Sequence, residues 1–217
     1  ATDPSLRRPA LELLLTVEEE TGLIGANSLT PDFVKGRILL NLDSEDEGTF
    51  TIGCAGGRDA RMLLPLARKA VSERDEKVGL ELRVGGLRGG HSGTDIALGR
   101  GNAIKILARA LQALLATGEI DLCAGQGGSA HNAIPRDAWF LFAVAKDRVA
   151  ELGALVERTA AMLRAEYALV EPELSLQLSP VELPPAATAL VEPQRCCDFL
   201  MALPHGVAAM SAAIPSL

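Results

Sequence analysis

The sequence is poor in the residues that build most metal and redox sites. Its only histidines are His91, His131 and His205, whereas a zinc-dependent hydrolytic centre normally takes several ligands from histidine. Four cysteines occur, two of them adjacent at Cys196 and Cys197, and none forms a Cys-x-x-Cys pair. We therefore expect reduced, mostly buried thiols in a cytoplasmic protein, not a thiolate metal site or a cysteine nucleophile.

Two further absences exclude classes of partner. No apolar run approaches the roughly 20 residues that a membrane-spanning helix needs. The formal net charge is -7 and no basic stripe is present, which argues against binding to a nucleic-acid backbone. With 217 residues, 48% of them hydrophobic, the chain can still bury one large core or two small ones. The sequence thus predicts a globular protein that contacts neither membranes nor nucleic acids.

Carboxylates gather at two places where a strand is expected to end. Glu19 and Glu20 follow an apolar run at residues 11–15, and Asp43 follows another at residues 37–42. Neighbouring side chains on an extended segment point to opposite sides, so one of two adjacent glutamates can bind a metal ion while the other faces a nearby water. The alternative is that both clusters are solvated acidic loops.

The hydrophobic pattern after residue 57 predicts a compact mixed domain. Alternation over residues 77–84 indicates a half-buried strand, and apolar residues at helical spacing follow a glycine-rich turn at residues 85–93. The later segments read as two strands, a second amphipathic helix and a closing strand, at residues 120–124, 138–145, 148–169 and 174–178. The order is β-α-β-β-α-β, a ferredoxin-like unit whose helices cover one face of an antiparallel sheet.

Other segments give weaker predictions. Thr30, Pro31 and Gly36 suggest a short helix at residues 31–35. A helix at residues 186–203 is expected to be kinked or interrupted by Pro193. The last residues resemble a strand cut short, and the chain begins without methionine beside an apparent interior strand. We therefore expect a fragment of a longer protein.

Five short motifs occur in one order along most of the chain. They are Glu-Glu-Thr-Gly at residues 19–22, Asn-Leu-Asp-Ser-Glu-Asp-Glu-Gly at 41–48, Gly-Cys-Ala-Gly-Gly at 53–57, Gly-Gly-His-Ser-Gly at 89–93 and Asn-Ala-Ile-Pro-Arg at 132–136. In this order the chain resembles the zinc-dependent aminoacyl-histidine dipeptidases, which cleave Xaa-His dipeptides such as carnosine. The resemblance implies an α/β fold in which residues 1–56 are part of the catalytic domain and residues 57–217 are an α+β lid of the dimerisation type, truncated at its end.

The resemblance also implies a role for each matching residue. Glu19 would be the general base and Glu20 and Asp43 zinc ligands, whereas His91 would approach the scissile carbonyl and Asn132 would bind the substrate. The complete enzyme would hold two zinc ions, bind a small dipeptide and be able to form a homodimer. Because the remaining ligand segments of the family have no match here, we expect this chain alone to be inactive.

Three functions remain open at this stage. The first is hydrolysis of Xaa-His dipeptides as a zinc metallopeptidase. The second is a related metal-dependent amidase, deacylase or broad aminopeptidase, since one centre can cleave many amides. The third is a non-catalytic interaction domain that pairs with another copy through a sheet edge or a helix. On the residues alone, His91 could also merely cap a helix and Asn132 merely form a turn.

Overall fold

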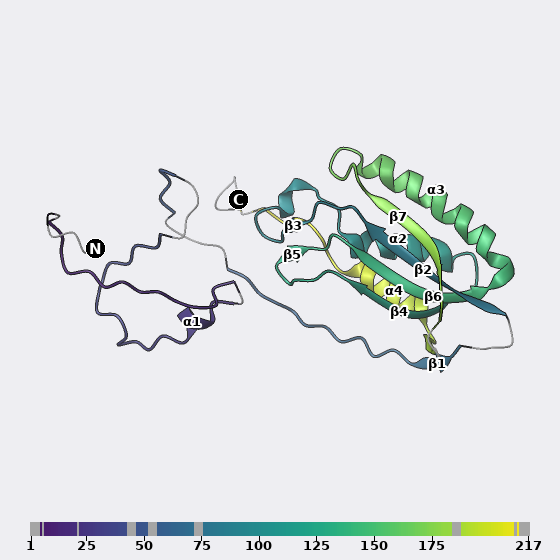
Figure 1. The fold of residues 1–217 in the computed structure, drawn as a ribbon, viewed down its shortest axis with the longest axis horizontal. Coiled ribbons are helices and arrows are strands. Elements are labelled where there is room, and N and C mark those ends of the chain that lie inside the picture. Colours follow the sequence, from purple (N-terminus) through teal and green to yellow (C-terminus); the bar gives the residue numbers. More distant parts are fainter. Residues whose placement is uncertain are drawn as a thin grey trace. The chain divides into compact units, whose positions relative to one another are not determined.

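The computed structural model describes residues 5, 7–20, 22–42, 47–51, 56–71, 76–183, 188–210 and 212. Its contacts divide the chain into two units, Ala1–Ala60 and Arg61–Leu217 (Figure 1). Each unit is described by itself. No helix in the described part of the chain is both long enough and apolar enough to cross a membrane.

The first unit contains one short helix, α1 (Ile24–Asn27), among its described residues. The prediction of strands at residues 11–15 and 37–42 is wrong, because these segments pair with no described strand and largely face solvent. Leu15, for example, is 91% exposed. Apolar sequence alone does not make a strand, since the backbone N–H and C=O groups also need a neighbouring strand.

The short helix predicted at residues 31–35 is also absent. Phe33 N–H donates to the Thr30 carbonyl at 3.0 Å, which closes a turn. The amides of Lys35 and Gly36 donate to the Glu12 carboxylate at 2.7 and 3.0 Å. These two N–H groups therefore bind a side chain, not the carbonyls of a preceding helical turn.

The second unit is built on a four-stranded antiparallel sheet in the order β4-β6-β2-β7. Its strands are β2 (Lys77–Gly85), β4 (Asp121–Gly127), β6 (Ala138–Ala145) and β7 (Ser175–Val181). The central strand β2 places Leu82 opposite Phe140 on one side and opposite Leu178 on the other. The alternation predicted for β2 is confirmed, because Leu80, Leu82 and Val84 are buried.

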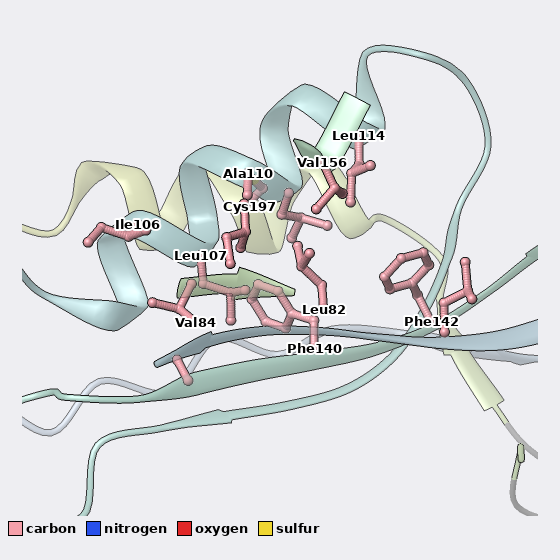
Figure 2. Packing of buried hydrophobic residues seen from close by; sticks show 14 of the residues in the cluster. Leu82, Val84, Ile106, Leu107, Ala110, Leu114, Phe140, Phe142, Val156 and Cys197 are labelled. Carbon is pink, nitrogen blue, oxygen red and sulfur yellow. The ribbon is translucent and has the colours of Figure 1, made fainter. Parts of the chain in front are cut away.

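Helices α2 (Ala103–Leu115) and α3 (Val149–Tyr167) complete the predicted β-α-β-β-α-β order, which is confirmed. Figure 2 shows side chains of α2 facing the sheet: Leu107 lies near Phe140, and Val156 of α3 lies beside Leu114. Short 3-10 turns, η2 (Ile96–Leu98) and η3 (Lys146–Arg148), precede α2 and α3 respectively. The apolar stripes of both helices are buried against the same face of the sheet.

Two small sheets and a third helix flank this core. They are β1 (Arg68–Ala70) with β8 (Thr188–Leu190), β3 (Gly90–His91) with β5 (Ala133–Ile134), and α4 (Pro193–Ala202). The predicted C-terminal helix is shorter than expected. It begins at Pro193 instead of being interrupted there, because the first helical position needs no N–H donor.

Helix α4 is fastened to α2 at two points. The Lys105 ammonium donates to the carbonyls of Leu200, Met201 and Leu203 at 2.6–2.9 Å and so satisfies the end of α4. The buried Cys197 thiol contacts the Ala108 carbonyl at 3.4 Å, and burial raises its pKa to about 11. The expectation of buried, free thiols is confirmed for Cys123 and Cys197.

An ion pair joins the two long helices at their exposed side. Arg109 of α2 donates two hydrogen bonds to Glu166 of α3, at 2.8 and 2.6 Å. These bonds hold the pKa of the Glu166 carboxyl below its ordinary value, because they stabilise the carboxylate. Both side chains remain more than one third exposed, so water weakens the attraction.

We expect the contribution of Glu166 to stability to depend on pH. Because its folded-state pKa is lowered, the contribution is complete above the ordinary glutamate value of about 4.3 and is lost as pH falls through the folded-state value. Glu166→Gln should lower the free energy of unfolding at pH 7 by less than about 1 kcal/mol. Urea unfolding followed by Trp139, the only tryptophan, should show this difference shrink at acidic pH. A difference that grows on acidification would contradict the prediction.

Candidate functional site

Glu19 and Glu20 lie in an exposed turn of the first unit. Glu18 has a positive φ of 54°, and the amides of Gly22 and Leu23 donate to the Glu19 carbonyl at 3.1 and 2.9 Å. This turn leads into α1, and both carboxylates face solvent. The predicted metal ligand Asp43 lies outside the described residues.

The described residues do not by themselves fit a zinc ion. A protein zinc site takes three or four side-chain ligands. In the ranges that the structure describes, no group of three or more histidine, cysteine, aspartate or glutamate residues is placed to hold a metal. Glu20 could supply one ligand, so a site that includes it needs ligands in addition to those described.

The structure brings His91 and Asn132 together in the second unit. Strands β3 and β5 pair Gly90 with Ile134 and His91 with Ala133. The next residue, Ser92, donates its N–H to the Asn132 carbonyl at 2.8 Å and so extends the ladder. Two motifs that are distant in sequence therefore meet at one short antiparallel pair.

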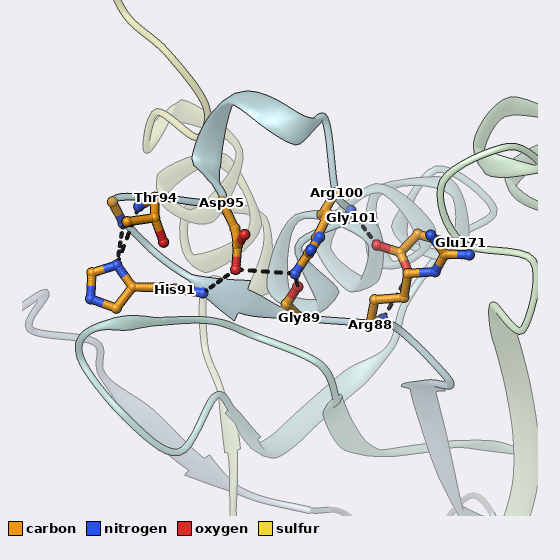
Figure 3. A network of polar contacts seen from close by, with 9 residues as sticks. Arg88, Gly89, His91, Thr94, Asp95, Arg100, Gly101 and Glu171 are labelled. Atoms are coloured by element: carbon orange, nitrogen blue, oxygen red, sulfur yellow. Dashed lines mark hydrogen bonds and ion pairs between the residues drawn. The ribbon is translucent and has the colours of Figure 1, made fainter. Parts of the chain in front are cut away.

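The ring of His91 is held in one tautomer by its own turn. Its Nδ1 atom accepts hydrogen bonds from the amides of Gly93 and Thr94, at 3.1 and 3.2 Å (Figure 3). An acceptor nitrogen carries no proton, so the proton of the neutral ring is on Nε2. Nε2 binds no other described residue, and the side chain is exposed. The arrangement presents one N–H donor to whatever approaches this turn.

Gly93 leaves room for this contact. A Cβ atom at position 93 would lie 3.2 Å from both Nδ1 and Cε1 of His91, which is closer than most side-chain contacts. The glycine therefore lets the turn close onto the imidazole. This is a steric reason for the Gly-Gly-His-Ser-Gly motif beyond conformational freedom.

The segment at residues 88–101, which we call the His91 loop, is fixed at its base by a buried glutamate. Glu171, after α3, is 1% exposed and accepts hydrogen bonds from Arg88 N–H and Gly101 N–H, both at 2.8 Å. One carboxylate thus joins the two ends of the loop, as Figure 3 shows. The sequence analysis missed Glu171, because nothing in the sequence distinguishes it from the other glutamates.

The C-terminal part of the second unit also reaches this region. Asn102 caps α2 by accepting from the amides of Ile104 and Lys105 at 3.0 and 3.3 Å. His205, which follows α4, places Nδ1 3.3 Å from the Asn102 amide nitrogen and Nε2 3.3 Å from the Arg100 carbonyl. The start of α2 is therefore fixed from both sides.

Comparisons with known proteins agree with this architecture. Residues 82–171 match the family model described as peptidase dimerisation domain. Over 205 residues the chain is 40% identical to the cytosol non-specific dipeptidase of Escherichia coli K12, covering 94% of this chain and 42% of that protein. The crystal structure of aminoacylhistidine dipeptidase from Vibrio alginolyticus superposes with a TM-score of 0.73 at 35% identity, covering 92% of this chain and 40% of that chain.

The fold and these matches identify, within the second unit, a domain of the peptidase dimerisation type. The particular resemblance predicted from the sequence, to aminoacyl-histidine dipeptidases, is confirmed, and both named relatives are peptidases. The chain spans about two fifths of the length of each relative, at 42% and 40%.

Glu171→Gln should loosen the His91 loop. The amide has one acceptor oxygen, and its NH2 group would face a backbone N–H, which leaves a buried donor unsatisfied at a cost of about 1–3 kcal/mol. We expect urea unfolding to show a loss of this size and hydrogen exchange to be faster at the amides of Arg88 and Gly101. The exposed Glu173→Gln is the matched control. Equal exchange rates in the two variants would contradict the role given to Glu171.

Proposed function

We propose that this chain is part of a cytoplasmic, metal-dependent dipeptidase that hydrolyses small dipeptides, Xaa-His dipeptides among them. The observation that carries the proposal is the His91 turn, in which Nδ1 is occupied by two amides and Nε2–H is left as an outward donor. The printed names of the two relatives, one a non-specific dipeptidase and one an aminoacylhistidine dipeptidase, support the reaction class.

Each predicted site residue has a place in this proposal. Residues 1–56 contribute to the catalytic domain, where Glu19 is the general base that takes a proton from the attacking water. Glu20 and Asp43 would be zinc ligands, completed by further ligands, in an enzyme that holds two zinc ions. Residues 57–217 form the lid, in which His91 and Asn132 contact the substrate.

The chemistry of His91 follows from its tautomer. Attack of water on a peptide carbonyl makes a tetrahedral oxyanion, and an N–H donor directed at that oxygen stabilises the charge as it develops. A donor that is already oriented needs no reorganisation during the reaction. Asn132 shares the β3–β5 ladder with His91 through the Ser92 contact, so the two residues can engage one bound peptide together.

Removing the Nε2–H donor of His91 should reduce turnover more than it weakens binding of the dipeptide. In the complete protein that carries this chain, His91→Ala should lower kcat by about 10²–10³-fold and change KM little. Glu19→Gln should also abolish most activity, because the amide cannot accept the proton. The measurement is hydrolysis of a panel of Xaa-His dipeptides, other dipeptides and N-acyl amino acids.

The exposed His131→Ala is the matched control for His91→Ala. Equal kcat in the two variants would contradict the role of His91. Faster cleavage of N-acyl amino acids than of any dipeptide would instead favour the amidase or deacylase alternative.

A second proposed function is pairing of two copies through this lid. Strand β7 has β2 on one side, and none of the described strands pairs with its other edge. Such an edge offers N–H and C=O groups to another strand. The matched family model, described as a peptidase dimerisation domain, supports a homodimer.

Light scattering after size exclusion tests this second function on the 217-residue chain. We expect a mass twice the 22.8 kDa of one chain at high concentration, falling towards one chain on dilution. A single chain at all concentrations would contradict pairing by this domain.

A further inference from the structure

The His91 loop contains a second anchor that lies closer to the histidine than Glu171. Asp95 Oδ2 accepts the His91 N–H at 2.9 Å, and the Asp95 N–H donates back to the His91 carbonyl at 3.1 Å. The two residues are therefore joined by a reciprocal pair of hydrogen bonds, one of them to a carboxylate. Figure 3 shows Asp95 between His91 and Arg100.

Arg100 locks Asp95 in place. Its Nη1 atom lies 3.2 Å from Asp95 Oδ2 and donates to the Gly89 carbonyl at 2.5 Å. The side chains of Asp95 and Arg100 are 29% and 25% exposed, so water only partly screens the pair. A single nitrogen of Arg100 thus connects the end of the loop both to its beginning and to the carboxylate that holds His91.

The backbone at Gly90 is shaped around this pair. Gly90 has a φ of 144°, and a Cβ atom there would lie 2.3 Å from Arg100 Nη1 and 2.5 Å from Asp95 Oδ2. The space next to the residue before His91 is therefore filled by the ion pair itself. Any side chain at position 90 would displace the carboxylate or the guanidinium.

We propose that Asp95, held by Arg100, is a positioning residue that keeps the His91 ring seated on the amides of Gly93 and Thr94. Without this anchor the His91 backbone is free to shift, the two contacts to Nδ1 open, and the Nε2–H donor loses its fixed direction. The inference rests on the proposed function for its catalytic consequence, although the geometry of the ring can be tested without any activity. Asp95 itself does not touch the imidazole, so it acts only through His91.

Nitrogen NMR of the histidine rings in the 15N-labelled 217-residue chain tests the inference directly. At about pH 8, where an ordinary imidazole is neutral, the His91 signals should show an unprotonated Nδ1 and a protonated Nε2. They are assigned by their loss in His91→Gln. In Asp95→Asn both signals should move towards the averaged values of a ring that exchanges between tautomers.

Two further variants guard the result. Arg100→Lys keeps the positive charge but shortens its reach, so the His91 signals should move in the same direction as in Asp95→Asn, by a smaller amount. This variant replaces Asp95→Asn if Asp95→Asn does not fold. Glu166→Gln removes a carboxylate from the ion pair with Arg109, away from the His91 loop, and its His91 spectrum should match that of the parent chain. Unchanged His91 signals in both Asp95→Asn and Arg100→Lys would overturn the inference, as would averaged signals in the parent chain.

Kinetics separate this inference from the proposed function. In the complete protein, Asp95→Asn should lower dipeptide kcat by about tenfold to a hundredfold, because small misplacement of a catalytic group has effects of this size, while KM stays within about twofold. An unchanged kcat would overturn the positioning role. If the parent enzyme cleaves no dipeptide, the proposed function fails, and the ring spectra alone decide whether Asp95 positions His91.

Discussion

Burial of the inner face of β2 is the constraint on which the second unit depends. This strand lies between β6 and β7, and its alternate residues Leu80, Leu82 and Val84 are at most 2% exposed under α2 and α3. Each such side chain contributes about 1.5–3 kcal/mol when fully buried. A shift of register by one residue would turn all three towards the other face, so the core also fixes the pairing of the sheet.

The candidate site takes its order from this core. The His91 loop leaves the end of β2 and returns at the start of α2, so both ends are attached to elements with buried faces. Glu171 then joins those ends, and Asp95 with Arg100 joins the interior of the loop to its beginning. The exposed His91 ring, held by the amides of Gly93 and Thr94, therefore lies in a loop that is fastened both at its base and in its interior.

The sequence predicted the elements that depend on hydrophobic periodicity. It did not predict the local structure that depends on contacts with distant residues. Alternation and helical spacing were sufficient for the β-α-β-β-α-β order, since one buried face leaves a clear pattern. Two segments of the first unit, at residues 11–15 and 37–42, are also rich in apolar residues. They form no strand, because a strand also needs a pairing partner. Where the sequence predicted a helix at residues 31–35, the amides of Lys35 and Gly36 bind the Glu12 carboxylate, a contact that no local pattern reveals.

The residues of the candidate site also fall into those that the sequence reveals and those that it does not. His91 could be found from its glycine-rich motif, whereas Glu171 and Asp95 act through backbone amides that are known only once the loop is folded. Glu171 lies 83 residues from Arg88 and 70 from Gly101, so neither contact could be read from spacing. The roles of all five predicted site residues depend on the resemblance and stay predictions: Glu19, Glu20, Asp43, His91 and Asn132.

The carboxylate of Glu171 has a consequence for how the His91 loop can evolve. It binds main-chain N–H groups at the two ends of the His91 loop, and Gly101 leaves it room, because a Cβ atom at position 101 would lie 3.2 Å from Glu171 Cγ. Exposed positions between them, such as Ala97 and Leu98, can accept new residues while the entry and exit of the loop stay fixed. Natural selection can therefore remodel the exposed surface of the loop without redesigning the domain beneath it.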